Sequence, residues 1–186
     1  MIEVIDNFLD DKLFSDLQDY CKQEFQIVKV GAGDQWKEFL VIDTPDSIRE
    51  QLELDGHRIV LTFIRKAHKD FDTEPRIHSD GIIYNQYVHV ASVLYINDLE
   101  GVYPRNGTMF YEHKVHGEAL PKDVTGEVYN EVLRDSNHVG KFRETDRIYA
   151  KPNRLLSYPA QNFHAKFPPK IERGERIVLV TFYSEI

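Results

Sequence analysis

Cysteine is almost absent from this sequence: Cys21 is the single cysteine among 186 residues. One cysteine excludes an intrachain disulfide framework and any metal cluster held by several thiolates of one chain. The sequence also lacks a run rich in lysine or arginine, and its 23 basic residues against 31 acidic ones give a net charge of −8. A chain of this charge does not attract a polyanion, so nucleic acid is not expected among its partners.

Long hydrophobic runs are missing as well. No stretch approaches the roughly 20 apolar residues that a membrane-spanning helix needs, so no membrane partner is expected. The opening segment, MIEVIDNFLDDKLF, carries acidic residues where a signal peptide has a basic start and an apolar run. The sequence therefore predicts a soluble, unprocessed protein in a reducing, cytoplasmic setting. No motif in it fixes the oligomeric state.

The chain does contain enough apolar material for one core. Hydrophobic residues make up 41% of the sequence and aromatic residues 12%, which at this length favours a single domain over residues 1–186. Helix signals come first: Asp10 or Asp11 can cap a helix whose apolar positions recur at three- and four-residue intervals. The pair Thr44-Pro45 is a second helix start.

Strand signals follow from about residue 58 onwards. Segments rich in β-branched and aromatic residues are typical of half-buried strands, and they lie near 58–64, 87–96, 107–115, 154–158 and 175–183. Helices followed by strands indicate an α+β fold with an antiparallel sandwich or barrel. The polar segment 117–148 breaks this pattern, and we interpret it as an insertion between core strands that is either a lid or a solvated loop.

The stretch RIHSDG places His78 and Asp80 two residues apart. In an extended chain this spacing puts both side chains on one face, so one strand end can supply an imidazole and a carboxylate. With a second histidine, such a set leaves positions open on an octahedral ion for O₂ and a co-substrate, as a non-haem Fe(II) oxygenase requires. A surface hydrogen bond between the two residues is the alternative. His113 and His116 are expected at the surface, because a three-residue spacing on a strand points them to opposite faces.

The C-terminal block, NRLLSYPAQNFHAKFPPKIERGERIVLVTFY, supplies that second histidine, His164, between two strand-like segments. Together with MIEVIDNFLDDKLFSDL, ASVLYIND and NGTMFYE, in this order and spacing, the block resembles the 2-oxoglutarate/Fe(II)-dependent dioxygenases, most closely their prolyl 4-hydroxylase-like branch. The resemblance covers nearly the whole chain. It implies a double-stranded β-helix (jelly-roll) core with N-terminal supporting helices.

The resemblance also implies a chemistry. His78, Asp80 and His164 become the ligands of Fe(II), and 2-oxoglutarate and O₂ become co-substrates, with ascorbate as an optional addition. The implied reaction hydroxylates a peptide or protein residue, with proline the leading candidate, and releases succinate and CO₂. Because the metal-binding aspartate is retained, no coordination position is freed for chloride, and halogenation is not expected.

A 2-oxoglutarate carboxylate held inside the barrel needs a fixed cationic fork. Arg176 fits this need because it directly precedes the apolar residues of the last strand-like segment. Arg173 is the rival, although it lies in the turn-like sequence Glu-Arg-Gly-Glu. Tyr95 matches a strand tyrosine that joins the arginine on the same carboxylate, and its alternative is an ordinary core tyrosine.

Three other functions compete with peptide hydroxylation. A hydroxylase of a free amino acid or another small metabolite uses the same iron chemistry, and a non-catalytic jelly roll binds a metal or a partner without turnover. A nucleic-acid demethylase on the same fold carries Asn and a second Arg on the last strand, where this chain has IVLVTFY after Arg176. That difference and the acidic charge disfavour the demethylase.

Overall fold

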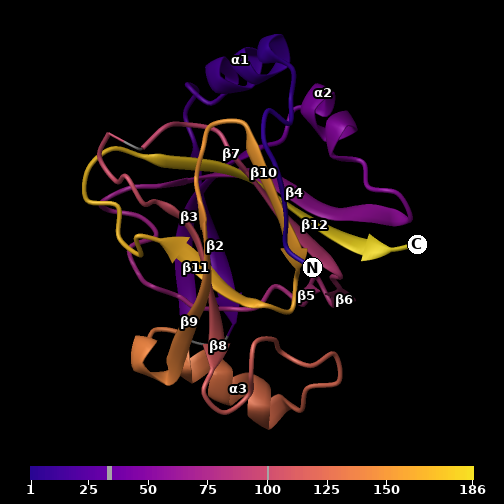
Figure 1. The fold of residues 1–186 in the computed structure, drawn as a ribbon, viewed down its shortest axis with the longest axis vertical. Helices are drawn as coiled ribbons and strands as arrows, with labels where there is room; N and C mark the ends of the chain where they lie inside the picture. Colours follow the sequence, from indigo (N-terminus) through magenta and orange to yellow (C-terminus); the bar gives the residue numbers. More distant parts are fainter. Residues whose placement is uncertain (33–34, 100) are drawn as a thin grey trace.

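The computed structural model describes residues 1–32, 35–99 and 101–186. Within these ranges the chain forms two main antiparallel β-sheets, with helices at the top and bottom of the view in Figure 1. The larger sheet has the order β1 (Glu3–Ile5), β10 (Arg154–Pro159), β7 (Val90–Tyr95), β12 (Arg176–Glu185), β4 (His57–Ala67), β3 (Gln35–Asp43) and β2 (Gln26–Ala32). The smaller sheet has the order β11 (Phe163–Phe167), β8 (Gly107–His113) and β9 (Phe142–Tyr149). A short hairpin joins β5 (Ile82–Ile83) to β6 (Gln86–Tyr87).

The connections between the sheets define the architecture. From β7 to β12 the chain passes from the larger sheet to the smaller one, back to the larger, and across twice more. Strand β12, the last in chain order, lies between β7 and β4 and pairs antiparallel with both. Two antiparallel sheets with such crossovers are a jelly roll, which confirms the predicted mostly antiparallel sandwich.

Side-chain alternation gives each sheet two apolar faces. On β7, Leu94 packs with Leu17 in one cluster, whereas Val93 and Tyr95 pack between the sheets with Tyr158. The outer face of the larger sheet meets α1 (Asp11–Tyr20), α2 (Asp46–Arg49) and the 3₁₀ turn η1 (Glu50–Leu52). The outer face of the smaller sheet meets α3 (Gly126–Asp135) (Figure 1). No helix in the described ranges is long and apolar enough to cross a membrane.

Helix α1 begins where the sequence predicts. The Asp10 carboxylate accepts a hydrogen bond from the backbone N–H of Leu13 at 2.8 Å, which satisfies one free donor of the first helical turn. The apolar stripe then buries Leu17 and Cys21 against the larger sheet. The cap therefore fixes where the helix starts, and the stripe fixes which face is covered.

Asp10→Ala should lower the free energy of unfolding by about 1 kcal/mol, because the N-cap acceptor is lost while the buried face of α1 is untouched. Urea denaturation followed by circular dichroism measures this change. Asp10→Ser keeps an oxygen acceptor and should remain close to the unmodified protein. Equal losses in both variants would show that the cap is not the cause.

Segment 117–148 is more regular than its sequence indicates. It contains α3, the 3₁₀ turn η2 (Val139–Lys141) and most of β9. Thr125 caps α3, and Val132 is buried in the cluster beneath the smaller sheet. Strand β9 was missed because it lies at the edge of its sheet with an exposed charged stretch, so it lacks the apolar alternation of a half-buried strand. The segment is packed and structured, and its role as a lid remains a prediction.

His113 is buried, which corrects the prediction of a surface position. Its side chain is 1% exposed, and its Nε2 lies 3.2 Å from Oδ2 of Asp135 in α3. The ring of His116 stacks on it, and Nε2 of His116 lies 3.0 Å from Glu131. The parity argument failed because β8 ends at His113 and the chain turns back through Gly117, so the two histidines do not share an extended strand.

Candidate metal centre

Three predicted residues come together at one end of the space between the sheets. His78 and Asp80 lie on the segment between β4 and β5, and His164 lies on β11. A backbone bridge joins the two histidines: each N–H donates to the other's carbonyl oxygen, at 3.0 and 2.9 Å. The bridge aligns the imidazoles side by side, with ring centroids 4.5 Å apart.

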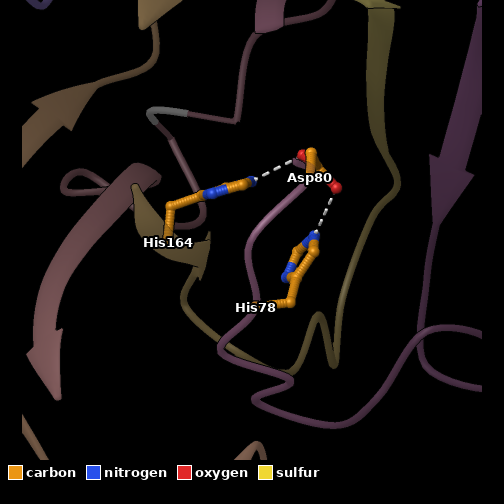
Figure 2. A group of neighbouring side chains, drawn as sticks. All are labelled: His78, Asp80 and His164. Atoms are coloured by element: carbon orange, nitrogen blue, oxygen red, sulfur yellow. Dashed lines mark ion pairs between the residues drawn. The ribbon is translucent and has the colours of Figure 1, made fainter. Parts of the chain in front are cut away.

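The carboxylate of Asp80 faces both imidazoles, and each of its oxygens lies opposite one ring, as Figure 2 shows. Its Oδ1 is 3.4 Å from Nε2 of His78, and its Oδ2 is 3.2 Å from Nε2 of His164. One potential ligand atom from each residue lies within 4.8 Å of the others. Two nitrogens and one carboxylate oxygen so arranged can occupy one face of an octahedral ion.

The hydrogen bonds of the far ring nitrogens fix the imidazole tautomers. Nδ1 of His78 is 2.8 Å from the carbonyl oxygen of Arg76, and Nδ1 of His164 is 3.0 Å from that of Asn162. A carbonyl oxygen only accepts, so each Nδ1 carries a proton, and the neutral form of each ring has its lone pair on Nε2. Both lone pairs lie beside the Asp80 carboxylate, and a shared cation would relieve the repulsion between these electron-rich atoms.

The protonation states suit a metal ion better than a proton as that cation. Burial lowers the pKa of His78 to about 3, so its ring stays neutral near pH 7. Burial acts to raise the pKa of Asp80, whereas the cationic forms of His78 and His164 and the Arg76 guanidinium act to lower it, and the net pKa is lowered. Neutral imidazole and ionised carboxylate are the forms that bind metals.

Tyr158 lies against the triad and was not singled out from the sequence. Its hydroxyl is 3.0 Å from Nε2 of His164, and its ring packs edge-on against Phe110. Burial raises the pKa of Tyr158 well above its usual value, so the side chain stays a neutral phenol. Inward parity on β10 could have indicated its position, but parity alone does not separate it from other core tyrosines.

Arg176 and Tyr95 also share the interior, whereas Arg173 is exposed. Arg176 is 8% exposed, and its guanidinium carbon lies 5.7 Å from the centre of the Tyr95 ring. Its Nη2 is 3.5 Å from the carbonyl oxygen of Gly107, a contact too long to be a strong hydrogen bond. The Tyr95 hydroxyl is 2.7 Å from that of Thr108. Of the two candidate arginines, only Arg176 is therefore placed to meet a ligand between the sheets.

A cluster of charged side chains that no sequence motif predicts lies in the same interior. Asp72, from the segment between β4 and β5, has its Oδ2 2.5 Å from Nη2 of Arg65 and its Oδ1 3.2 Å from Nζ of Lys166. Lys166 follows His164 by two residues on β11, so strand parity could have indicated its inward direction. Asp72 lies in irregular chain, and no local pattern marks it.

A small pocket opens beside the triad. Ser79 and Gly81, the neighbours of Asp80, form one side of it, and the other side includes Leu120, Lys122 and Tyr129 from segment 117–148. A larger hollow of about 280 Å³ lies beside α1, on the other face of the larger sheet, and contains none of the triad. The larger hollow is therefore separate from the candidate metal centre.

No protein-family model matches the sequence, and no curated relative matches it. Solved structures do share its fold. The non-heme alpha ketoglutarate-dependent carbocyclase SnoK from nogalamycin biosynthesis aligns with a TM-score of 0.63 at 11% identity, over 99% of this chain and 79% of SnoK. HygX from Streptomyces hygroscopicus, solved with nickel and 2-oxoglutarate, aligns with a TM-score of 0.60 at 10% identity, over 99% of this chain and 82% of HygX.

A protein described as an oxidoreductase of the 2OG-Fe(II) oxygenase family, from Burkholderia pseudomallei, aligns with a TM-score of 0.55 at 10% identity, over 98% of this chain and 84% of that protein. The TM-scores show that these proteins share a fold with this chain, and at sequence identities of 10–11% the comparison shows the fold alone. The chain therefore has the jelly-roll fold of the non-haem 2-oxoglutarate-dependent oxygenases. None of these three neighbours is described as a prolyl hydroxylase, so the resemblance to that branch stays a prediction.

Proposed function

We propose that this protein is an Fe(II)/2-oxoglutarate-dependent oxygenase with His78, Asp80 and His164 as its metal ligands. The proposal rests on one observation: in the part of the chain that the structure describes, the same interior holds a set of metal-binding side chains that lacks a cation and an arginine that lacks an anion. Two Nε2 lone pairs and a carboxylate converge at the triad, which suits a divalent cation. Arg176 is buried near the same space without an anionic partner among the described residues.

Arg176 supports 2-oxoglutarate as the co-substrate. Its Nε is buried and has no hydrogen-bond partner in the described part of the chain. A buried charge without a partner costs several kcal/mol, so an anion is expected beside it. A dicarboxylate with a keto group can chelate a metal at one end and present its distal carboxylate to the guanidinium at the other. The bound 2-oxoglutarate of HygX is consistent with this choice.

Bound Fe(II), 2-oxoglutarate and O₂ would supply the oxidising chemistry, with succinate and CO₂ as products. The chain's own residues bind and orient these groups. The backbone bridge and the two Nδ1 hydrogen bonds hold the imidazoles in position, as supporting contacts do for metal ligands generally. Tyr158 and Phe110 pack beside His164 and exclude water from that side of the centre.

Two classes of substrate are candidates for this site. The sequence resemblance favours a peptide or protein residue, with proline leading. The neighbours favour a small molecule, because SnoK belongs to nogalamycin biosynthesis and HygX has been solved with hygromycin B. The net charge of −8 disfavours nucleic acid in either case. Substrate contacts are proposed at the small pocket beside the triad, where segment 117–148 would act as the lid. We also propose that α1 and α2 support the larger sheet from its opposite face.

Succinate formation from 2-oxoglutarate with Fe(II) and O₂ should rise when the correct substrate class is added. Proline-containing peptides, free proline, a set of small metabolites and methylated oligonucleotides can be compared by succinate release and product mass. Stimulation by small molecules but not by peptides would discard the prolyl branch. Stimulation only by oligonucleotides would contradict the charge argument. Metal binding with no succinate under any condition would instead favour a non-catalytic jelly roll.

A further inference from the structure

Three cationic side chains, those of Arg65, Lys166 and Arg176, lie around the carboxylate of Asp72. Arg65 and Lys166 both pair with Asp72, and among the described residues Arg176 pairs with no carboxylate. The side chains of Lys166 and Asp72 are 8% and 5% exposed. The Nε atoms of Arg65 and Arg176 are buried and have no hydrogen-bond partner in the described chain. The three cations therefore carry more positive charge than the Asp72 carboxylate neutralises, and the two Nε–H groups are free to donate to a ligand.

Strand register places Lys166 and Arg176 over the same part of β8. Lys166 pairs with Thr108 across β11 and β8, and the next pair is Phe167 with Gly107. Arg176 approaches the carbonyl oxygen of Gly107, and Thr108 bonds the Tyr95 hydroxyl beside Arg176. Because Lys166 has the same strand parity as His164, its side chain leaves β11 on the face that carries the triad histidine.

Electrostatics agrees with this placement. The charges of Arg65 and Arg176 repel the Lys166 ammonium, and the Asp72 carboxylate attracts it. The pKa of Asp72 is lowered overall, because Arg65 and Lys166 outweigh the effect of burial. The three cations and Asp72 thus act on one another as a single charged cluster.

We propose that Lys166 is a second ligand, beside Arg176, for the distal carboxylate of 2-oxoglutarate, and that Asp72 sets the affinity by competing for the Lys166 ammonium. This inference rests on the proposed function. Asp72 lies on the irregular segment that leads to His78 and Asp80, so its side chain can withdraw without breaking a strand pair of either main sheet. When the co-substrate binds, its carboxylate would take over contacts that Asp72 makes in this structure.

The test is calorimetric titration of the Mn(II)-loaded protein, without O₂, with 2-oxoglutarate and with 2-oxobutyrate, which lacks the distal carboxylate. Lys166→Met should weaken 2-oxoglutarate binding about 10–100-fold, the range for loss of a charged hydrogen bond, and leave 2-oxobutyrate binding unchanged. Asp72→Asn keeps all three cations and should bind 2-oxoglutarate roughly three- to tenfold more tightly, because a competing negative charge is removed.

Lys170→Met is the matched control, because Lys170 is an exposed lysine four residues along the chain. It should bind both ligands like the unmodified protein. Equal weakening of both ligands in Lys166→Met would make Lys166 structural and overturn the inference. If Lys166→Met does not fold, Asp72→Asn decides: unchanged or weaker 2-oxoglutarate binding overturns the inference. Failure of the unmodified protein to bind 2-oxoglutarate would overturn the proposed function itself.

Discussion

His164→Ala should lower the affinity for Fe(II) by at least about 100-fold and abolish succinate formation from 2-oxoglutarate. Loss of a group that merely orients a metal ligand costs about 10–100-fold in affinity, and His164 would be a ligand itself. Its removal leaves His78 and Asp80, which no longer form a facial set of three. Calorimetric titration with Fe(II) under anaerobic conditions measures affinity, and succinate detection measures turnover.

His138→Ala is the control for this experiment. His138 is exposed and lies between α3 and η2, outside the triad, so its loss should change neither metal affinity nor turnover. Circular dichroism establishes that both variants are folded. If His164→Ala kept the Fe(II) affinity of the unmodified protein, the triad would not be the metal site, even though the fold is that of the oxygenases.

Arg176→Met should raise the 2-oxoglutarate concentration needed for half-maximal turnover by several hundred-fold or more. A carboxylate left in the interior without its cation costs about 3–5 kcal/mol, judged from broken buried ion pairs. Methionine retains much of the volume, so the change isolates charge and hydrogen bonding from packing. Steady-state succinate formation against 2-oxoglutarate concentration measures the effect.

Arg173→Met separates the two candidate arginines. Arg173 is exposed on the turn before β12, and its replacement should leave the 2-oxoglutarate requirement unchanged. The reverse pattern, with a large effect at Arg173 and none at Arg176, would move the carboxylate site out of the interior. Effects at both positions would indicate that the turn and the strand start act together.

Local sequence signals were sufficient to predict which residues come together in part of the candidate site. The two-residue spacing of His78 and Asp80 fixed their common direction, and family resemblance supplied His164 from a distant segment. Arg176 followed from its place before an alternating apolar strand, and the structure buries it where Arg173 stays exposed. These predictions depended on spacing within one strand or on a recognised motif. Both kinds of signal can be read from the sequence without knowing which strands pair.

The missed features depend on contacts between distant segments. Lys166 and Asp72 meet only because β11 pairs with β8 and the segment after β4 folds inward. His113 is buried because α3 and the rings of Phe142 and Phe163 pack around the end of β8, and the spacing of the histidines does not predict these contacts. Strand β9 is an edge strand whose charged residues hide its regular structure from a periodicity argument. No motif in the chain identifies the substrate.

The central place of β12 has a consequence for folding. This strand pairs along its length with β4, more than 100 residues earlier in sequence, and also with β7. During synthesis β4 and β7 emerge long before β12, and until it joins them each exposes unpaired backbone along one edge. Pairings of such long sequence separation also slow folding. The sheet that carries Arg176 is thus completed late, and a cell that makes this protein must protect those edges from association in the interval.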